Sequence, residues 1–395
     1  MIAKQKQVKA LDGNKAAAHG VLLCKPDVVS VYPITPQTPL PEELWRFSSE
    51  GLLEAETVEA EGEMSVMSAL IGASAAGGRT FGATSGSGLA FMFEAYCQSA
   101  PLRLPIVMAI ATREMIGPSC VLAGEQDVFS VRDVGWIHIH CETCQEILDS
   151  IIMAYKLAED PDILLPVNIC YDGYYLSHAT ELVNIPLQED VDNFLGPRKE
   201  RLTVKPDVHM YFGTADPTLR FAEYRYKHIA ALERSKGKIE DIDCEFQHSF
   251  GRSYGGLIER YRMDDADVAL VALGSCAGTA KVVIDAQREA GVKAGLIRLR
   301  SVRPFPKEIL RESLKGVKGI GVIDRNICFG FNTGTVFMEL KAALYDLVPL
   351  KPMANLIIGI GGSDITIERI KKALEITSRA ANGQPFEEVT WLDLE

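Results

Sequence analysis

A short polar motif, Tyr32-Pro-Ile-Thr-Pro-Gln-Thr38, directly follows the apolar run 28–32. In open α/β sheets, the loops that leave the carboxyl ends of the strands line the ligand crevice, where backbone groups and helix N-termini are exposed. Pro36 stops the strand and favours an extended conformation at Thr35. The same residues also fit a stiff turn in which Thr38 caps the next helix. Spacing alone leaves both interpretations open.

A run of carboxylates, Glu54-Ala-Glu-Thr-Val-Glu-Ala-Glu-Gly-Glu63, leads into a helix that we expect at residues 59–76. Most of these carboxylates are expected to be solvated or to lie near the positive N-terminus of the helix. Glu63 differs because the apolar residues that follow it would carry it towards the core. A buried carboxylate is costly without a partner, and is then a candidate for a hydrogen bond to a cofactor.

Two further segments follow predicted strands. The turn Thr84-Ser-Gly-Ser-Gly88 comes after the strand expected at 80–84, and its backbone N–H groups could bind an anion, although such a turn is a weak signal. Arg113 comes after the apolar run 105–111. Its guanidinium could hold a carboxylate bidentately, and a surface salt bridge is the alternative.

Other polar groups are expected to be structural. Glu125 and Asp127 lie in the loop after Arg113, where charged pairs are usually solvated. Three histidines show no metal-ligand spacing and no nucleophile partner: His138, His140 and His178. Cys141 and Cys144 form one CxxC, but a zinc or iron–sulfur site needs four ligands and no second pair follows at a suitable spacing. We therefore expect no metal site in this chain.

The elements that must position these residues alternate between strands and helices, which predicts an α/β fold with parallel sheets. In the first part of the chain we expect strands at 28–32, 80–84, 105–111, 137–140 and 164–171, and helices at 59–76 and 145–159. From residue 266 a second βαβαβ pattern is expected, with strands at 268–273, 294–299, 319–323 and 353–360, helices at 277–290, 306–314 and 365–378, and a polar tail at 380–395.

The chain is expected to form two domains. Residues 1–243 make the first, and its last part, from about 186, reads as a connecting segment with scattered prolines, charged residues and an amphipathic stretch at 219–235. Residues 244–395 make the second domain.

Composition narrows the class of protein. The 395 residues are 47% hydrophobic and 24% charged, with a net charge of −12 and no basic block, which argues against nucleic-acid binding. The longest apolar runs are under half the length that a membrane-spanning helix needs. The first residues lack the apolar stretch of a secretory signal, and most of the nine cysteines stand alone in apolar runs. We expect a cytoplasmic protein.

Together these segments resemble the α subunits of the pyruvate (2-oxoacid):ferredoxin oxidoreductase family. The resemblance is carried by Tyr32–Pro36, Glu63–Ala69, Gly72–Phe81, Val131–Trp136, Leu165–Val167, Asp172–Gly173, Leu273–Lys281, Arg298–Pro306 and Val322–Asn326. It implies a first domain like the pyrimidine-binding domain of thiamine-diphosphate enzymes, and a second like the transketolase C-terminal domain.

The resemblance also implies residue roles. Glu63 would hydrogen-bond N1′ of the aminopyrimidine and favour its imino tautomer. Thr35 and Arg113 would hold the carboxylate and carbonyl of the substrate. The implied contacts of the cofactor also include Pro33, Ile34, Thr84 and Ser85.

The half of such a site that binds the diphosphate and Mg²⁺ normally uses a Gly-Asp-Gly motif, but here Asp172-Gly173 is preceded by Tyr171. The resemblance therefore implies a β subunit that holds that half, and γ/δ-type subunits with [4Fe–4S] clusters. The implied reaction is decarboxylation of a 2-oxoacid on thiamine diphosphate, with the acyl group released to coenzyme A. Electrons would pass to ferredoxin or to an NAD-linked flavoprotein.

Two departures from the family bear on the substrate. Val121-Leu-Ala-Gly-Glu-Gln-Asp127 stands where pyruvate enzymes commonly have an Asn-Asp-His-Ser-Asp stretch, and Thr84–Gly88 lacks the usual glutamine. These changes admit pyruvate or a bulkier branched-chain or aryl acid of the phenylglyoxylate kind. Two alternatives remain: an acyl-transfer subunit of the transketolase or 2-oxoacid-dehydrogenase-complex type, and a non-catalytic scaffold that retains the fold.

Overall fold

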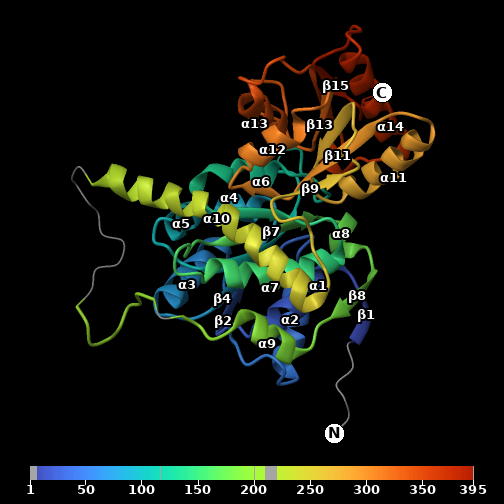
Figure 1. Ribbon diagram of the computed structural model, residues 1–395. Coiled ribbons are helices and arrows are strands. Elements are labelled where there is room, and N and C mark those ends of the chain that lie inside the picture. Colours follow the sequence, from blue (N-terminus) through green and yellow to red (C-terminus); the bar gives the residue numbers. More distant parts are fainter. Residues whose placement is uncertain (1–6, 116, 200, 210–219, 395) are drawn as a thin grey trace.

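The computed structural model describes residues 7–115, 117–199, 201–209 and 220–394. Two large sheets dominate it, and each belongs mainly to one half of the chain (Figure 1). The first has the strand order β12-β6-β7-β5-β4-β2-β3, and all its neighbours are parallel except β12 and β6. Its strands are β2 (Val28–Val31), β3 (Glu56–Glu59), β4 (Thr80–Thr84), β5 (Ile106–Thr112), β6 (Ile137–His140), β7 (Val167–Asp172) and β12 (Ser301–Arg303).

Hydrophobic runs make the centre of this sheet. Strands β4, β5 and β7 are buried at every position, as expected for parallel strands covered by helices. The helix α7 (Cys144–Ala158) packs on β5 and β7, and α3 (Glu63–Ala75) packs on β2 and β4. The other helices of this half are α1 (Gly13–Cys24), α2 (Pro39–Ser49), α4 (Ser87–Phe91), α5 (Phe93–Ser99), α6 (Gln126–Ser130), η1 (Arg132–Val134), α8 (Tyr175–His178) and α9 (Gln188–Leu195).

Local capping explains where the two packed helices of the core begin. The Asp12 side chain accepts a hydrogen bond from the backbone N–H of Lys15 (2.8 Å) at the start of α1. Thr143 caps α7 in the same way through the N–H of Glu146 (3.1 Å). The small antiparallel pair β1 (Gln7–Leu11) and β8 (Glu181–Ile185) lies beside these helices.

The second sheet has the order β15-β14-β13-β10-β11-β9, with only β9 antiparallel to its neighbour. Its strands are β9 (Ile258–Tyr261), β10 (Val268–Ala272), β11 (Ala294–Leu299), β13 (Gly319–Asp324), β14 (Met353–Ile357) and β15 (Val389–Trp391). Its helices are α11 (Cys276–Glu289), α12 (Lys307–Leu314), α13 (Thr335–Leu344), η2 (Ile360–Gly362) and α14 (Ile367–Ala381). The expected α/β fold with two parallel sheets is therefore confirmed.

One helix and one strand pairing connect the two halves of the chain. The helix α10 (Phe221–Phe250) runs across the first half beside α7 and extends past residue 243 (Figure 1). Strand β12 comes from the second half of the chain but pairs with β6 at the edge of the first sheet. The second half therefore completes the first sheet.

Three expectations for the elements were wrong. Residues 56–59 form strand β3 at the sheet edge, so the helix begins at Glu63 rather than at residue 59. The predicted polar tail contains β15, which extends the second sheet. Residues 221–235 of the amphipathic stretch are part of the longer helix α10, where a connecting segment was expected. In the described residues, no helix combines the length and the apolar character that crossing a membrane requires.

Candidate functional site

The loop after β2 is fixed from behind by buried side chains. Asn14 donates from Nδ2 to the carbonyl of Pro36 (2.9 Å) and accepts a hydrogen bond from the hydroxyl of Tyr171 (2.8 Å). The Thr35–Pro36 peptide is cis, and Thr35 itself is exposed. The loop therefore presents Thr35 at the carboxyl end of the sheet. Pro33 is exposed and Ile34 is half-buried beside it.

Glu63 is the first residue of α3, and its side chain is only 5% exposed. Among the described residues, no hydrogen bond or ion pair reaches its carboxylate. Gly88 lies against it, since a Cβ there would come within 2.6 Å of Glu63 Oε1 and 2.3 Å of Thr84 Oγ1. The Thr84 hydroxyl is also buried, and no residue that the structure describes bonds to it. Two polar groups thus converge on a glycine with unused hydrogen-bonding capacity.

Arg113 lies on the other side of the same turn. Its Nη1 donates to the carbonyl of Thr35 (2.7 Å) and its Nη2 to Ser87 Oγ (3.2 Å), whereas its Nε is buried and has no partner within the described part of the chain. Gly86 has φ +52°, and a Cβ there would lie 2.0 Å from Arg113 Nε. The turn after β4 therefore separates Glu63 from Arg113 and contacts both. Its Ser85 hydroxyl donates to the carbonyl of Ala111 (2.6 Å), next to the end of β5.

The structure brings together the predicted site residues Thr35, Thr84, Ser85 and Arg113 around one turn, with Glu63 on the far side of it. The expectation that Glu125 and Asp127 are solvated was wrong, since both are buried. Burial raises the pKa of the Asp127 carboxyl to about 7, against the opposing effect of three backbone N–H donors. Sequence spacing gave no sign of this, because two of the three donors, Gly86 and Arg113, lie outside the helix that carries Asp127.

Next to this site, β7 ends at Asp172, which is held from the second half of the chain. The Asp172 carboxylate forms an ion pair with buried Arg325 and accepts a hydrogen bond from the N–H of Ser275 (2.7 Å). Glu125 is also buried here, 3.6 Å from the ring of His140. The second half of the chain therefore fixes the end of β7.

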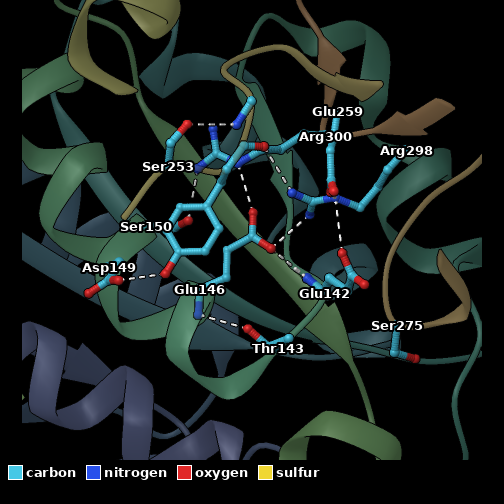
Figure 2. Close-up of polar contacts among 12 residues, drawn as sticks. Glu142, Thr143, Glu146, Asp149, Ser150, Ser253, Glu259, Ser275, Arg298 and Arg300 are labelled. Atoms are coloured by element: carbon cyan, nitrogen blue, oxygen red, sulfur yellow. Dashed lines mark hydrogen bonds and ion pairs between the residues drawn. The ribbon is translucent and has the colours of Figure 1, made fainter. Parts of the chain in front are cut away.

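A second contact between the halves is a buried cluster of charges, shown in Figure 2. Glu146 on α7 accepts hydrogen bonds from Arg298 Nη1 (2.7 Å) and Arg300 Nε (2.8 Å), and both arginines come from the segment β11–β12. Arg298 also contacts Glu142 (3.2 Å) and Glu259 (2.8 Å). Burial would raise the pKa of Glu146, but the two guanidinium groups outweigh it and hold that pKa below the usual range.

Other features lie away from the site. A cavity of about 330 Å³ lies beside Gly77, Gly78 and Arg79. These residues precede β4, so the cavity lies at the amino ends of the strands, whereas Arg113 lies at their carboxyl ends. Cys141 and Cys144 are buried free thiols, and burial raises the pKa of both. In the part of the chain that the structure describes, no group of three or more His, Cys, Asp or Glu side chains could hold a metal ion.

Family models match both halves of the chain. Residues 19–243 match the thiamine-diphosphate-binding domain of pyruvate flavodoxin/ferredoxin oxidoreductases, and residues 266–370 match core domain II of pyruvate:ferredoxin oxidoreductase. The chain belongs to this oxidoreductase family. Within the family it is an α subunit of a 2-oxoacid:acceptor oxidoreductase, because curated α subunits match it over nearly its full length.

Three of these relatives have different substrates in their names. The α subunit of NADH-dependent phenylglyoxylate dehydrogenase from Aromatoleum evansii is 43% identical and covers 99% of this chain and 95% of its own. PorA of pyruvate synthase from Methanocaldococcus jannaschii is 44% identical, with 95% and 96% covered. VorA of ketoisovalerate oxidoreductase from Pyrococcus abyssi is 40% identical, with 98% of each chain covered.

Solved structures agree with this fold. A 2-oxoglutarate:ferredoxin oxidoreductase from Magnetococcus marinus superposes with a TM-score of 0.71 at 20% identity, covering 94% of this chain and 65% of its own longer chain. A split-gene transketolase gives a TM-score of 0.55 at 14% identity, covering 93% of this chain and 98% of its own. Both likenesses concern the fold alone.

Residues in the first half of the chain fit the ring of thiamine diphosphate. An aminopyrimidine carries a ring nitrogen and an amino group in one plane, so it needs a carboxylate and a further polar group in a site with little side-chain bulk. Glu63 and Thr84 supply polar atoms to which no described residue bonds, and Gly88 leaves the space between them free. The oxidoreductase chain thus offers a place for the ring.

Proposed function

We propose that this α subunit supplies the pyrimidine side of a thiamine-diphosphate site and binds the carboxylate of a 2-oxoacid for oxidative decarboxylation. The observation that carries the proposal is the buried Glu63 carboxylate, which has no partner among the described residues. Isolated buried carboxylates are costly, so such a group is expected to have a ligand. The family relation supports the same assignment.

Different residues around the turn after β4 would bind the cofactor and the substrate. Glu63 would hydrogen-bond N1′ of the aminopyrimidine, while Pro33, Ile34, Thr84 and Ser85 would line the cofactor. Arg113, which retains an unpartnered Nε, would pair with the substrate carboxylate beside Thr35. When bound, thiamine diphosphate supplies the carbon nucleophile and takes up the electrons that decarboxylation leaves behind.

A partner chain is needed to complete the enzyme. We assign the diphosphate and Mg²⁺ to a β subunit, and [4Fe–4S] clusters to γ/δ-type subunits, because the described residues offer no metal-ligand group. Phe91 and Phe93 are 59% and 43% exposed, and Phe91 lies against Gly62, which precedes Glu63. An apolar rim of this kind favours a covering chain. The electron acceptor would be ferredoxin or an NAD-linked flavoprotein, and coenzyme A would take the acyl group.

The proposed substrate is pyruvate or a bulkier branched-chain or aryl 2-oxoacid. Relatives named for phenylglyoxylate, pyruvate and ketoisovalerate are 43%, 44% and 40% identical, so identity does not separate them. We also propose a cytoplasmic location, supported by nine free cysteines. The division into units at residues 1–243 and 244–395 remains our proposal, supported by a family match that ends at residue 243.

The test is acceptor reduction by the complex purified through a tag on this chain, with thiamine diphosphate and coenzyme A present. Pyruvate, 2-oxoisovalerate and phenylglyoxylate are compared as substrates. Glu63→Gln should lower turnover on the preferred acid by about 10²- to 10⁴-fold, the usual contribution of a positioned acid–base group. The matched control is Glu54→Gln, because Glu54 belongs to the same acidic run but is exposed.

Each outcome separates the alternatives. Full turnover in Glu63→Gln would show that the chain is a scaffold. Acyl transfer without acceptor reduction in the wild-type complex would instead identify an acyl-transfer subunit of the transketolase or dehydrogenase-complex type. Failure of the wild-type complex to bind thiamine diphosphate would refute the proposed cofactor itself.

A further inference from the structure

Asp127 is a buried carboxylate whose hydrogen bonds all come from backbone N–H groups. It lies in the short helix α6, with 0% of its surface exposed. Its Oδ1 accepts from the N–H of Val128 (2.8 Å), and its Oδ2 accepts from Gly86 (2.8 Å) and Arg113 (3.0 Å). No salt bridge to a cation is found for it within the described ranges. Such a carboxylate is costly to bury, so its position calls for a local reason.

The two donors to Oδ2 lie just after the ends of two neighbouring strands. Gly86 follows β4, and Arg113 follows β5. The parallel pairing of these strands ends at Thr84 and Ile110, so Gly86 and Arg113 lie beyond the last paired residues. Beyond the last backbone hydrogen bonds between β4 and β5, one carboxylate oxygen therefore joins the two backbones at the point where they enter the site.

The spacing of these backbones decides where the Arg113 guanidinium lies. Its Nη2 bonds Ser87 in the turn after β4, its Nη1 bonds the Thr35 carbonyl, and its side chain passes within 2.0 Å of where a Cβ of Gly86 would be. The guanidinium therefore lies between the backbone of Arg113 and the turn after β4. A change in the distance between that backbone and that turn would move the guanidinium.

We propose that Asp127 is a positioning residue for the reaction: by holding Gly86 and Arg113 on one oxygen, it fixes the guanidinium that receives the substrate carboxylate. The inference rests on the proposed function for Arg113, but it assigns a separate role to a residue outside the site. Preorganised charge is effective because it needs no rearrangement when substrate binds. A displacement of about 1 Å in such a group can cost about 10²-fold in rate.

The test variant is Asp127→Asn in the purified complex. Asparagine has the same shape but only one acceptor oxygen, so its amide NH₂ must face either Val128 N–H or the pair from Gly86 and Arg113. The expected result is a fall of about 10²-fold in kcat/KM, expressed mainly as a higher KM for the 2-oxoacid, with thiamine diphosphate still bound.

The chain offers a matched control in Asp324→Asn. Asp324 is equally buried, accepts backbone N–H groups from Val336 (2.9 Å) and Phe337 (3.0 Å), and also has a pKa raised by burial to about 7. It is the last residue of β13 in the second half of the chain, and its two N–H donors lie in the first turn of α13. This variant should reproduce any general loss of stability while leaving the KM for the 2-oxoacid unchanged.

A double-mutant cycle with Arg113→Gln separates positioning from structure. If Asp127 acts through Arg113, the loss from Asp127→Asn largely disappears in the Arg113→Gln background. Additive losses, or a wild-type KM in both Asp127→Asn and Asp127→Ala, would overturn the inference, because Asn keeps one oxygen that can still face Gly86 and Arg113 whereas Ala removes both acceptors. If Asp127→Asn does not assemble, Asp127→Glu displaces the same oxygen without removing the charge, and the same cycle applies. Because the wild-type complex must first turn over a 2-oxoacid, failure of the proposed function is seen separately.

Discussion

The buried cluster around Glu146 allows a prediction about how the two halves of the chain are held together (Figure 2). Glu146→Gln removes the only carboxylate that Arg300 contacts among the described residues. Arg300 is 3% exposed and keeps the Gly256 carbonyl, the Ser150 hydroxyl and the Tyr254 ring, so its charge would be buried with no carboxylate in direct contact among the described residues. Removing one partner of a buried ion pair costs about 3 to 5 kcal/mol. Because Gln keeps one acceptor oxygen, we expect a loss of about 3 kcal/mol.

Amide hydrogen exchange measures this loss without assuming that the chain unfolds in one step. A loss of about 3 kcal/mol corresponds to roughly 10²-fold faster exchange in α7 and β11, the elements on the two sides of the cluster. The control Glu388→Gln breaks the exposed pair with Lys341, which is worth under about 1 kcal/mol. Equal exchange in the two variants would refute the reasoning.

The pH dependence of the same variant has a defined sign. The folded-state pKa of Glu146 is held below its ordinary value, because the attraction of Arg298 and Arg300 exceeds the effect of burial. Its stabilising contribution is therefore present above the unfolded pKa of about 4.3 and is lost as pH falls through the folded pKa. The difference between wild type and Glu146→Gln should shrink below about pH 4.

Three further predictions concern single positions. Gly88→Ala would place a Cβ 2.6 Å from Glu63 Oε1, so the folded complex should lose affinity for thiamine diphosphate, as measured by titration of the apo-complex. Gly86→Ala would force a Cβ to 2.0 Å from Arg113 Nε at φ +52°, so it should raise the KM for the 2-oxoacid; an unchanged KM would mean that Arg113 does not bind substrate. The Asp324 pKa is raised from 3.8 to about 7 by burial, so its contribution to stability is largest below pH 3.8 and is lost as pH rises through 7, by roughly 4 kcal/mol. Urea titration should show a flatter pH dependence in Asp324→Asn.

Hydrophobic runs predicted the sheets well because a parallel strand is buried on both faces. The strands expected at 80–84 and 137–140 have those bounds in β4 and β6. The predicted start of the helix in the acidic run was wrong because Glu and Ala favour helix locally, whereas residues 56–59 pair with β2 as the edge strand β3. Strand β15 was missed because three residues carry too little pattern to be distinguished from a tail.

Site residues were predictable where the chemistry sits in one local motif. Thr35 and Arg113 follow strands, and Thr84 ends one, whose carboxyl ends must meet in a parallel sheet. The resemblance supplied the roles that we propose for them. Asp127 was not predictable, since its importance comes from two N–H groups that lie 41 and 14 residues away in sequence. A charged loop residue is solvated unless tertiary contacts enclose it, and sequence spacing does not reveal those contacts.

The order of the strands explains why the site is open on one side. The second half of the chain covers the β12-β6-β7 side of the first sheet, through strand β12 and through Arg325 and Ser275, which hold Asp172 at the end of β7. The turns that carry Thr35 and Thr84 follow β2 and β4 on the other side of β5. The contacts from the second half therefore fix the neighbouring strand ends without covering those turns. Glu63, which has no partner among the described residues, and exposed Phe91 therefore stay uncovered, and this supports the proposal that a second chain completes the site.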